Sequence, residues 1–210
     1  MSARLKTVVA CIMLSTAILM TFNAVAEEHL KKHIHGSLKN DIYTSPGRDF
    51  RVHVPVHEAT GGAVRDESGK RGDTEIAQVI FTDDFGAFYR IVSTKTTRSM
   101  DDVMNVFHDV RKKQILETPR GREIHVIDVE KEGAEMTVTT MDNGDAPKVQ
   151  KPDLVTANII FTANGRIYHL IAGYTLFGNR TVEDASNEAR QDVEVLLAGF
   201  EILDGDKHSK

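Results

Sequence analysis

Alternating apolar and polar residues predict the strands of this chain. In YTSPGRDFRVHVPV, residues 43–56, apolar side chains alternate with polar ones from Phe50 to Val56, so one face of a strand can enter a core. Pro55 has no amide hydrogen to donate to a ladder, and it therefore marks the end of this strand or an edge of its sheet. The residues that follow, 59–73, are rich in Gly, Ser and charge and predict a surface loop.

Three pairs of apolar segments predict hairpins. They are 76–82 with 88–97, 123–130 with 134–141, and 154–163 with 166–177. The third hairpin is the clearest, because Asn164-Gly165 can supply the two positive φ angles of a two-residue type I′ turn. Strands that are joined by such short turns must be antiparallel.

Two further segments predict amphipathic helices. Ser99 can cap the first, whose apolar residues recur at helical spacing as far as Val110. Thr181 can cap the second, which has an apolar stripe as far as Phe200. We therefore predict an α+β domain with a mostly antiparallel sheet of six to seven strands covered by two amphipathic helices. The polar alternation of the first strand favours an open sheet face, whereas the apolar run 157–161 favours burial on both faces, so the number of covered faces stays open.

The N-terminal residues have the pattern of a secretory signal. Arg4 and Lys6 precede an apolar run of 16 residues, 7–22, and Ala24-Val25-Ala26 provides a small-residue cleavage site. Because this run is shorter than the roughly 20 residues of a membrane-spanning helix, we predict cleavage and a mature chain that is not transmembrane. The only cysteine, Cys11, would leave with the signal. This pattern predicts a periplasmic or secreted bacterial protein without disulfides.

The predicted organisation has four parts. A signal peptide, 1–26, precedes a flexible His/Lys-rich leader, 27–41, a single α+β domain, 42–203, and a mobile tail, 204–210. The mature chain would keep 24 of the 26 Lys and Arg residues and all 31 Asp and Glu residues, a formal net charge of −7. Its basic residues are scattered along the sequence, which argues against nucleic acid as a partner.

The order of these elements resembles the PsbP-like superfamily, which includes the photosystem II extrinsic protein PsbP and the bacterial DcrB-type envelope proteins. The resemblance covers residues 42–203, in YTSPGRDFRVHVP, EIAQVIFTDDFGAFYRIV, SMDDV, ANIIFTANGRIYHLIAGYT and LLAGFEIL. It implies a central antiparallel sheet between helices, an α/β/α sandwich. It also implies an accessory or binding role, with no catalytic residues and no cofactor.

The polar side of the first strand and the loop after it form the candidate binding site. Exposed strand edges and loops are places where binding sites concentrate. We predict that an envelope protein or a small ligand binds there; the alternative is a solvated edge protected by charge and Pro55. The predicted contact residues are Arg51, His53, His57, Arg65, Lys70 and Arg71.

A histidine cluster in the leader is the candidate metal site. His29, His33 and His35 lie in HLKKHIH, and imidazoles at positions i and i+4 of a helix share a face and can bind a divalent transition metal. The alternative is a solvated leader that binds no metal.

An enzyme is the alternative class of function. A hydrolase-like enzyme would need a cleft in which His125 or His169 meets a carboxylate, and the sequence has neither a Gly-x-Ser-x-Gly nor a His-Glu-x-x-His motif. Asp84-Phe85-Gly86 spells the metal-binding triplet of protein kinases, but the other kinase motifs are absent and the triplet lies in a predicted hairpin turn. The sequence therefore favours a non-catalytic protein.

Overall fold

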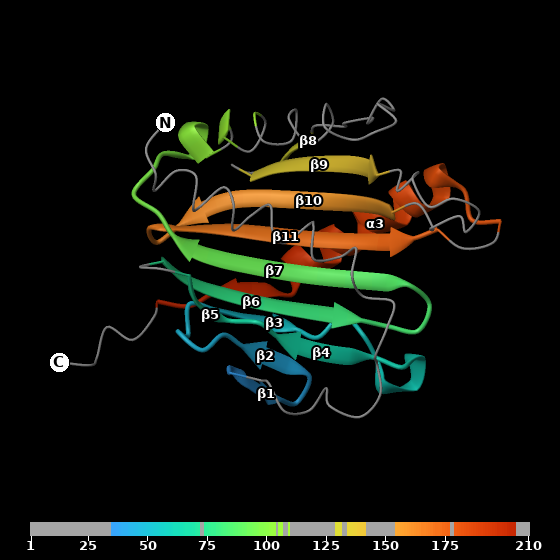
Figure 1. The fold of residues 1–210 in the computed structure, drawn as a ribbon, viewed down its shortest axis with the longest axis horizontal. Coiled ribbons are helices and arrows are strands. Elements are labelled where there is room, and N and C mark those ends of the chain that lie inside the picture. Colours follow the sequence, from blue (N-terminus) through green and yellow to red (C-terminus); the bar gives the residue numbers. More distant parts are fainter. Residues whose placement is uncertain are drawn as a thin grey trace.

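The strands of this protein form two sheets. The computed structural model describes residues 35–71, 74–103, 105–106, 109, 129–131, 134–141, 154–176 and 179–204. Within them, a large sheet of eight strands and a small sheet of four strands are both antiparallel (Figure 1). The predicted antiparallel α+β character is confirmed, whereas the single sheet of six to seven strands is wrong.

The large sheet contains the predicted hairpins. Its strand order is β4-β6-β7-β11-β10-β9-β8, with β5 paired to β6. The turn between β10 and β11 has φ angles of 49° at Asn164 and 68° at Gly165, as a type I′ turn requires. The strand bounds are β4 Ala63–Asp66, β5 Gly69–Arg71, β6 Thr74–Thr82, β7 Ala87–Lys95, β8 Val129–Lys131, β9 Ala134–Met141, β10 Leu154–Ala163 and β11 Arg166–Thr175.

The small sheet joins the two ends of the described chain. Its order is β1-β2-β3-β12, so β3 pairs on both sides and is not an edge strand. Pro55 instead follows the end of β3, the other position that its missing amide hydrogen had predicted. The predicted alternation is confirmed in β3, where Phe50 and Val52 are buried and Arg51 and His53 are exposed. The bounds are β1 Ser37–Lys39, β2 Ile42–Thr44, β3 Phe50–His53 and β12 Phe200–Ile202.

Two segments differ from the sequence prediction. Residues 59–73 had suggested a loop, but within them lie β4, β5 and most of the 3₁₀ turn η2 (Glu58–Thr60). These strands of three and four residues have too few positions to show a period, and they form because β6 offers a partner. The end of the predicted leader likewise forms the edge strand β1, which pairs with β2.

The C-terminal helix forms where the sequence predicted it. Helix α3 (Val182–Ala198) begins after Thr181, whose hydroxyl accepts a hydrogen bond of 3.1 Å from the amide of Asp184. The other predicted helix also begins after its expected cap, because residues 100–103 are helical and the amide of Asp102 donates to the Ser99 hydroxyl over 3.2 Å. Most of its later residues, and the connector 142–153, lie outside the described residues.

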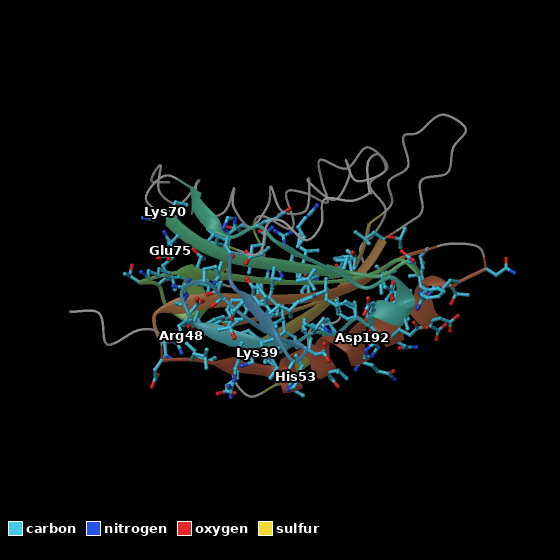
Figure 2. All side chains as sticks on the ribbon, turned by 90° about the horizontal axis from the view of Figure 1, so that it is seen from below. Lys39, Arg48, His53, Lys70, Glu75 and Asp192 are labelled. Atoms are coloured by element: carbon cyan, nitrogen blue, oxygen red, sulfur yellow. The ribbon has the colours of Figure 1, made fainter. Side chains whose placement is uncertain are left out.

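The main core lies between the large sheet and a layer made of α3 and the small sheet. Figure 2 shows this second layer beneath the large sheet. Side chains from both sheets and the helix pack in one apolar cluster, which includes Phe50 of β3, Tyr168 of β11 and Leu196 of α3. The rings of Phe50 and Phe200 stack 5.3 Å apart, and Tyr168 meets both of them edge-on.

A buried carboxylate fastens the small sheet to the large one. Asp49 precedes β3 and is only 5% exposed. Its Oδ2 accepts a 2.6 Å hydrogen bond from Ser93 Oγ of β7 and lies 3.0 Å from Arg166 Nε of β11. Its Oδ1 accepts from Ser45 Oγ over 2.8 Å, and Arg166 Nε also donates to Ser93 Oγ. We call Asp49, Ser93 and Arg166 the Asp49 joint.

We expect loss of the Asp49 joint to destabilise the domain. Asp49→Ala should lower the free energy of unfolding by about 3–5 kcal/mol, because it leaves the Arg166 guanidinium buried without its counter-charge. Urea denaturation would measure the change.

Glu201→Ala is the matched control for that measurement. It breaks the exposed ion pair with Arg51, whose side chains are 48% and 53% exposed, and it should cost about 0–1 kcal/mol. Equal losses in the two variants would contradict a special role for the Asp49 joint.

Candidate functional site

The candidate site is the solvent-facing side of the small sheet. Because side chains alternate along each strand, the register brings Lys39, Ile42 and His53 into one row across β1, β2 and β3. The next row contains Ser37, Thr44, Arg51 and Glu201. We call these seven residues the outer face.

Charged side chains on the outer face are exposed. Arg51 forms an ion pair with its cross-strand neighbour Glu201, at 2.5 Å from Nη2 and 2.7 Å from Nε to the same carboxylate oxygen. Lys39 and His53 are also exposed, and neither forms an ion pair with any residue that the structure describes. The outer face therefore presents one matched charge pair, one uncompensated ammonium group and one imidazole.

Sequence reasoning found only part of this face. Arg51 and His53 were predicted contacts, but Lys39 and Glu201 were missed because they lie on strands of three residues. The alternation of Phe200, Glu201 and Ile202 was the one signal that could have identified Glu201.

The other predicted contact residues lie elsewhere. Arg65 follows Val64 of the main core in β4, so it points to the opposite side of the large sheet, where it forms a 2.7 Å ion pair with Glu67. Lys70 of β5 is paired in register with Glu75, and Figure 2 places both away from Lys39 and His53. Arg71 is the last residue of β5.

His57 belongs to a turn rather than to the outer face. It is exposed and precedes η2, and its carbonyl oxygen accepts hydrogen bonds from the amides of Thr60 and Gly62. The amide of Asp84 in turn donates to the carbonyl oxygen of Thr60 over 3.0 Å. His57 is therefore tied to the turn that connects β6 and β7.

The leader histidines stay a prediction as a metal site. His29 and His33 lie outside the described residues. His35 is exposed, and its amide donates to Asp66 Oδ2 over 3.0 Å. In the part of the chain that the structure describes, no group of three or more His, Cys, Asp or Glu residues has the arrangement of a metal site.

His169 lies on the face of the large sheet that is turned away from α3. It is buried on β11, and its Nε2 lies 3.1 Å from Oδ1 of Asn158 on β10. Burial, and then the charge of Arg90, lower the pKa of His169 from 6.5 to about 3. Such an imidazole is neutral at pH 7 and binds a proton too weakly to act as an effective general base. His125, the other histidine of the enzyme alternative, lies outside the described residues.

A second carboxylate is used to hold the N-terminal strands. Asp66 of β4 accepts hydrogen bonds from the Tyr43 hydroxyl at 2.6 Å, the Gly36 amide at 2.7 Å and the Ser68 amide at 2.9 Å. Burial alone would raise the pKa of Asp66, but the hydrogen bonds from Ser68, Tyr43 and Gly36 outweigh it and leave the pKa below its ordinary value. Asp66 therefore stays ionised and holds β1 and β2 against β4.

A third carboxylate holds α3. The hydroxyls of Tyr89 on β7 and Tyr174 on β11 both donate to Oδ2 of Asp192. Burial and the hydrogen bond to Asp192 raise the pKa of Tyr174 to about 12, so this phenol stays protonated at neutral pH and remains a donor. Asp192 thus has a fastening role similar to those of Asp49 and Asp66.

The comparisons with known proteins give one structural likeness. No family model and no curated protein matches the sequence. Among solved structures, the chain is similar to that of cyanobacterial PsbP (CyanoP) from Synechocystis sp. PCC 6803. The identity is 11% and the TM-score 0.47, over 80% of this chain and 98% of that one. That protein carries the name of the superfamily that the sequence resembles, and the likeness concerns the fold alone.

The described helices differ from membrane-spanning helices. None of those helices has both the length and the apolar character that a crossing would need.

We expect His169 to give the domain an acid-sensitive stability. Its pKa is depressed in the folded state, so between pH 6.5 and about 3 the unfolded chain binds a proton that the folded chain does not. The His169 contribution is therefore complete above pH 6.5 and decreases by about 1.4 kcal/mol for each pH unit below it. Urea unfolding at a series of pH values would show a slope that is smaller by about one proton in His169→Gln.

His53→Gln is the control, because it removes an exposed imidazole. We expect its pH dependence to match that of the wild type. A wild-type slope in His169→Gln would contradict the burial argument.

Proposed function

We propose that this protein is an exported, non-catalytic accessory or binding protein of a bacterial envelope, and that it binds an envelope protein through the outer face. The proposal rests on where the polar groups of the described residues lie: buried and half-buried carboxylates hold the layers together, and other charged groups are exposed. The carboxylates of Asp49, Asp66 and Asp192 accept hydrogen bonds that fasten one layer to another. On the outer face, by contrast, the charged side chains of Lys39, Arg51 and Glu201 are exposed to a partner.

The same division disfavours catalysis by the described residues. A general base has to meet its proton donor in a site open to substrate and needs a pKa near the working pH. His169 is buried and has a pKa of about 3, whereas Asp49 is engaged by Ser45, Ser93 and Arg166. A hydrolase-like activity therefore finds no support in these residues.

The charge of the outer face indicates the kind of partner. Arg51 and Glu201 balance each other, which leaves Lys39 as an excess positive charge, with His53 in the same row on the far side of Ile42. The chain as a whole carries an excess of acidic residues, with a formal net charge of −5. We infer that the partner presents carboxylates to this face, since complementary charges increase the association rate and orient the encounter.

The proposed location rests on the N-terminal sequence. Residues 1–26 lie outside the described residues, and their signal-like pattern supports export to the periplasm or the exterior. We also propose that the helix beginning at Met100 covers the second face of the large sheet, because Val103 packs with Ile160 and Ile167 there. This arrangement would complete an α/β/α sandwich.

Chemical cross-linking in the native envelope would test the proposed function. The tagged mature protein, at native expression, should capture one protein in stoichiometric amount, which mass spectrometry would identify. The double substitution Lys39→Glu, His53→Glu should reduce capture at least about tenfold, because it removes the ammonium group of Lys39 and places two carboxylates on the outer face. Thermal unfolding would confirm that the variant is folded.

Lys70→Glu is the control, since it reverses the charge of one lysine at an exposed residue away from the outer face (Figure 2). It should leave capture unchanged. If Lys70→Glu reduced capture and the double variant did not, the contact would be at β5 instead. Capture of no stoichiometric partner would contradict the binding role itself.

A further inference from the structure

The turn between β6 and β7 displays an aromatic side chain to solvent. Phe85, the middle residue of the triplet Asp84-Phe85-Gly86, is 68% exposed, the largest value among the exposed large apolar side chains of the described residues. The turn lies at one end of the large sheet (Figure 1). Single exposed apolar residues are common on protein surfaces, so the case for a contact at Phe85 rests on how the turn is held and on the charge around it.

The turn is held rigidly by its own side chains and backbone. Oδ1 of Asp83 accepts hydrogen bonds of 2.9 Å from the amides of Phe85 and Ala87. Gly86 has a φ of 82°, a left-handed conformation that suits glycine. Phe85 is therefore carried by a closed and internally bonded loop.

Two other segments fix the turn from outside. The amide of Asp84 donates to the Thr60 carbonyl of η2, and the Thr175 amide of β11 donates to the Gly86 carbonyl, each over 3.0 Å. The carboxylate of Asp84 also lies against Gly61, where an added Cβ would come within 2.1 Å of Oδ2 of Asp84. The backbone of the turn that carries Phe85 is thus fixed by contacts with η2 and β11.

The surroundings of Phe85 are acidic. Asp84 is exposed beside it in the turn, and Glu58 is exposed in η2, which is bonded to the same turn. Arg180 follows the end of β11, whose Thr175 amide donates to the same turn, but its guanidinium stacks on the Tyr174 ring and forms an ion pair with Glu188. The carboxylates near Phe85, those of Asp84 and Glu58, therefore form no ion pair with any residue that the structure describes.

We propose that Phe85 is the anchor of a second protein contact, in which its ring enters an apolar pocket rimmed by Lys or Arg on a partner. A buried aromatic residue at the centre of an interface commonly supplies most of the binding energy. A turn whose backbone is already fixed loses little backbone entropy on binding. The acidic rim selects a basic partner surface, the opposite of the surface that suits the outer face. The inference rests on the proposed binding role but uses a different part of the molecule.

Site-specific photocross-linking would test this contact. The photoreactive phenylalanine analogue p-benzoylphenylalanine replaces Phe85 in the full chain, which is then irradiated in the native envelope. The control has the same analogue at Val195, which is 67% exposed on α3. We expect position 85 alone to cross-link to one protein, at a segment with apolar residues flanked by Lys or Arg.

Competition would measure the contribution of the ring. Purified unlabelled wild-type protein should suppress the cross-link, and the Phe85→Ser protein should need roughly 30-fold or more higher concentration for the same suppression. Because Phe85 is largely exposed, this variant should unfold at the wild-type temperature, which circular dichroism would confirm.

Four results would overturn the inference. They are equal yields at positions 85 and 195, no cross-link at position 85, a cross-link to a second copy of this chain, and a cross-linked segment without basic residues. If the outer-face variant still abolished capture while position 85 gave no cross-link, only this second contact would fail. If neither experiment captured a protein, the proposed function would fail as well.

Discussion

The rest of the structure depends on a charged pair buried between two sheets. Asp49 and Arg166 lie in a low-dielectric interface, where each charge alone would be strongly destabilising. Their attraction is useful only in one geometry, in which Ser45 and Ser93 complete the hydrogen bonds of the carboxylate. The small sheet can therefore dock on the large one in only one position. Apolar contacts such as Phe50 with Tyr168 add stability but tolerate more sliding.

Buried and half-buried carboxylates that accept hydrogen bonds also join the other layers of the fold. Tyrosine hydroxyls from the small sheet and the large sheet donate to Asp66 and Asp192, and burial keeps those phenols protonated. A polar interior that is satisfied in this way gives a well-defined fold and holds few groups ready for chemistry. The recognition proposed for this molecule therefore uses its surface, namely the outer face and the turn that carries Phe85.

The sequence predicted the long elements and missed the short ones, for a physical reason. Strands of eight to ten residues, such as β9 and β10, and the capped helix α3 repeat their pattern often enough to be read. Strands β1 and β12 have three residues each, and only their partners in the sheet hold them extended. Hence Lys39 and Glu201 were missed, and Arg65 was grouped with Arg51 although the two lie on different faces. Asp49 was not identified from the sequence, because no local pattern reveals its contact with Arg166.

The position of β12 also sets the order in which the molecule can be built. It pairs with β3 across about 150 residues of chain, as the register of Glu201 with Arg51 shows, so the small sheet lacks its last strand until the C-terminal segment is available. A chain that crosses a membrane from its N-terminus delivers that segment last. For a chain exported as proposed above, the outer face would be complete only after translocation, and a partner confined to the original compartment would never meet it in its finished form.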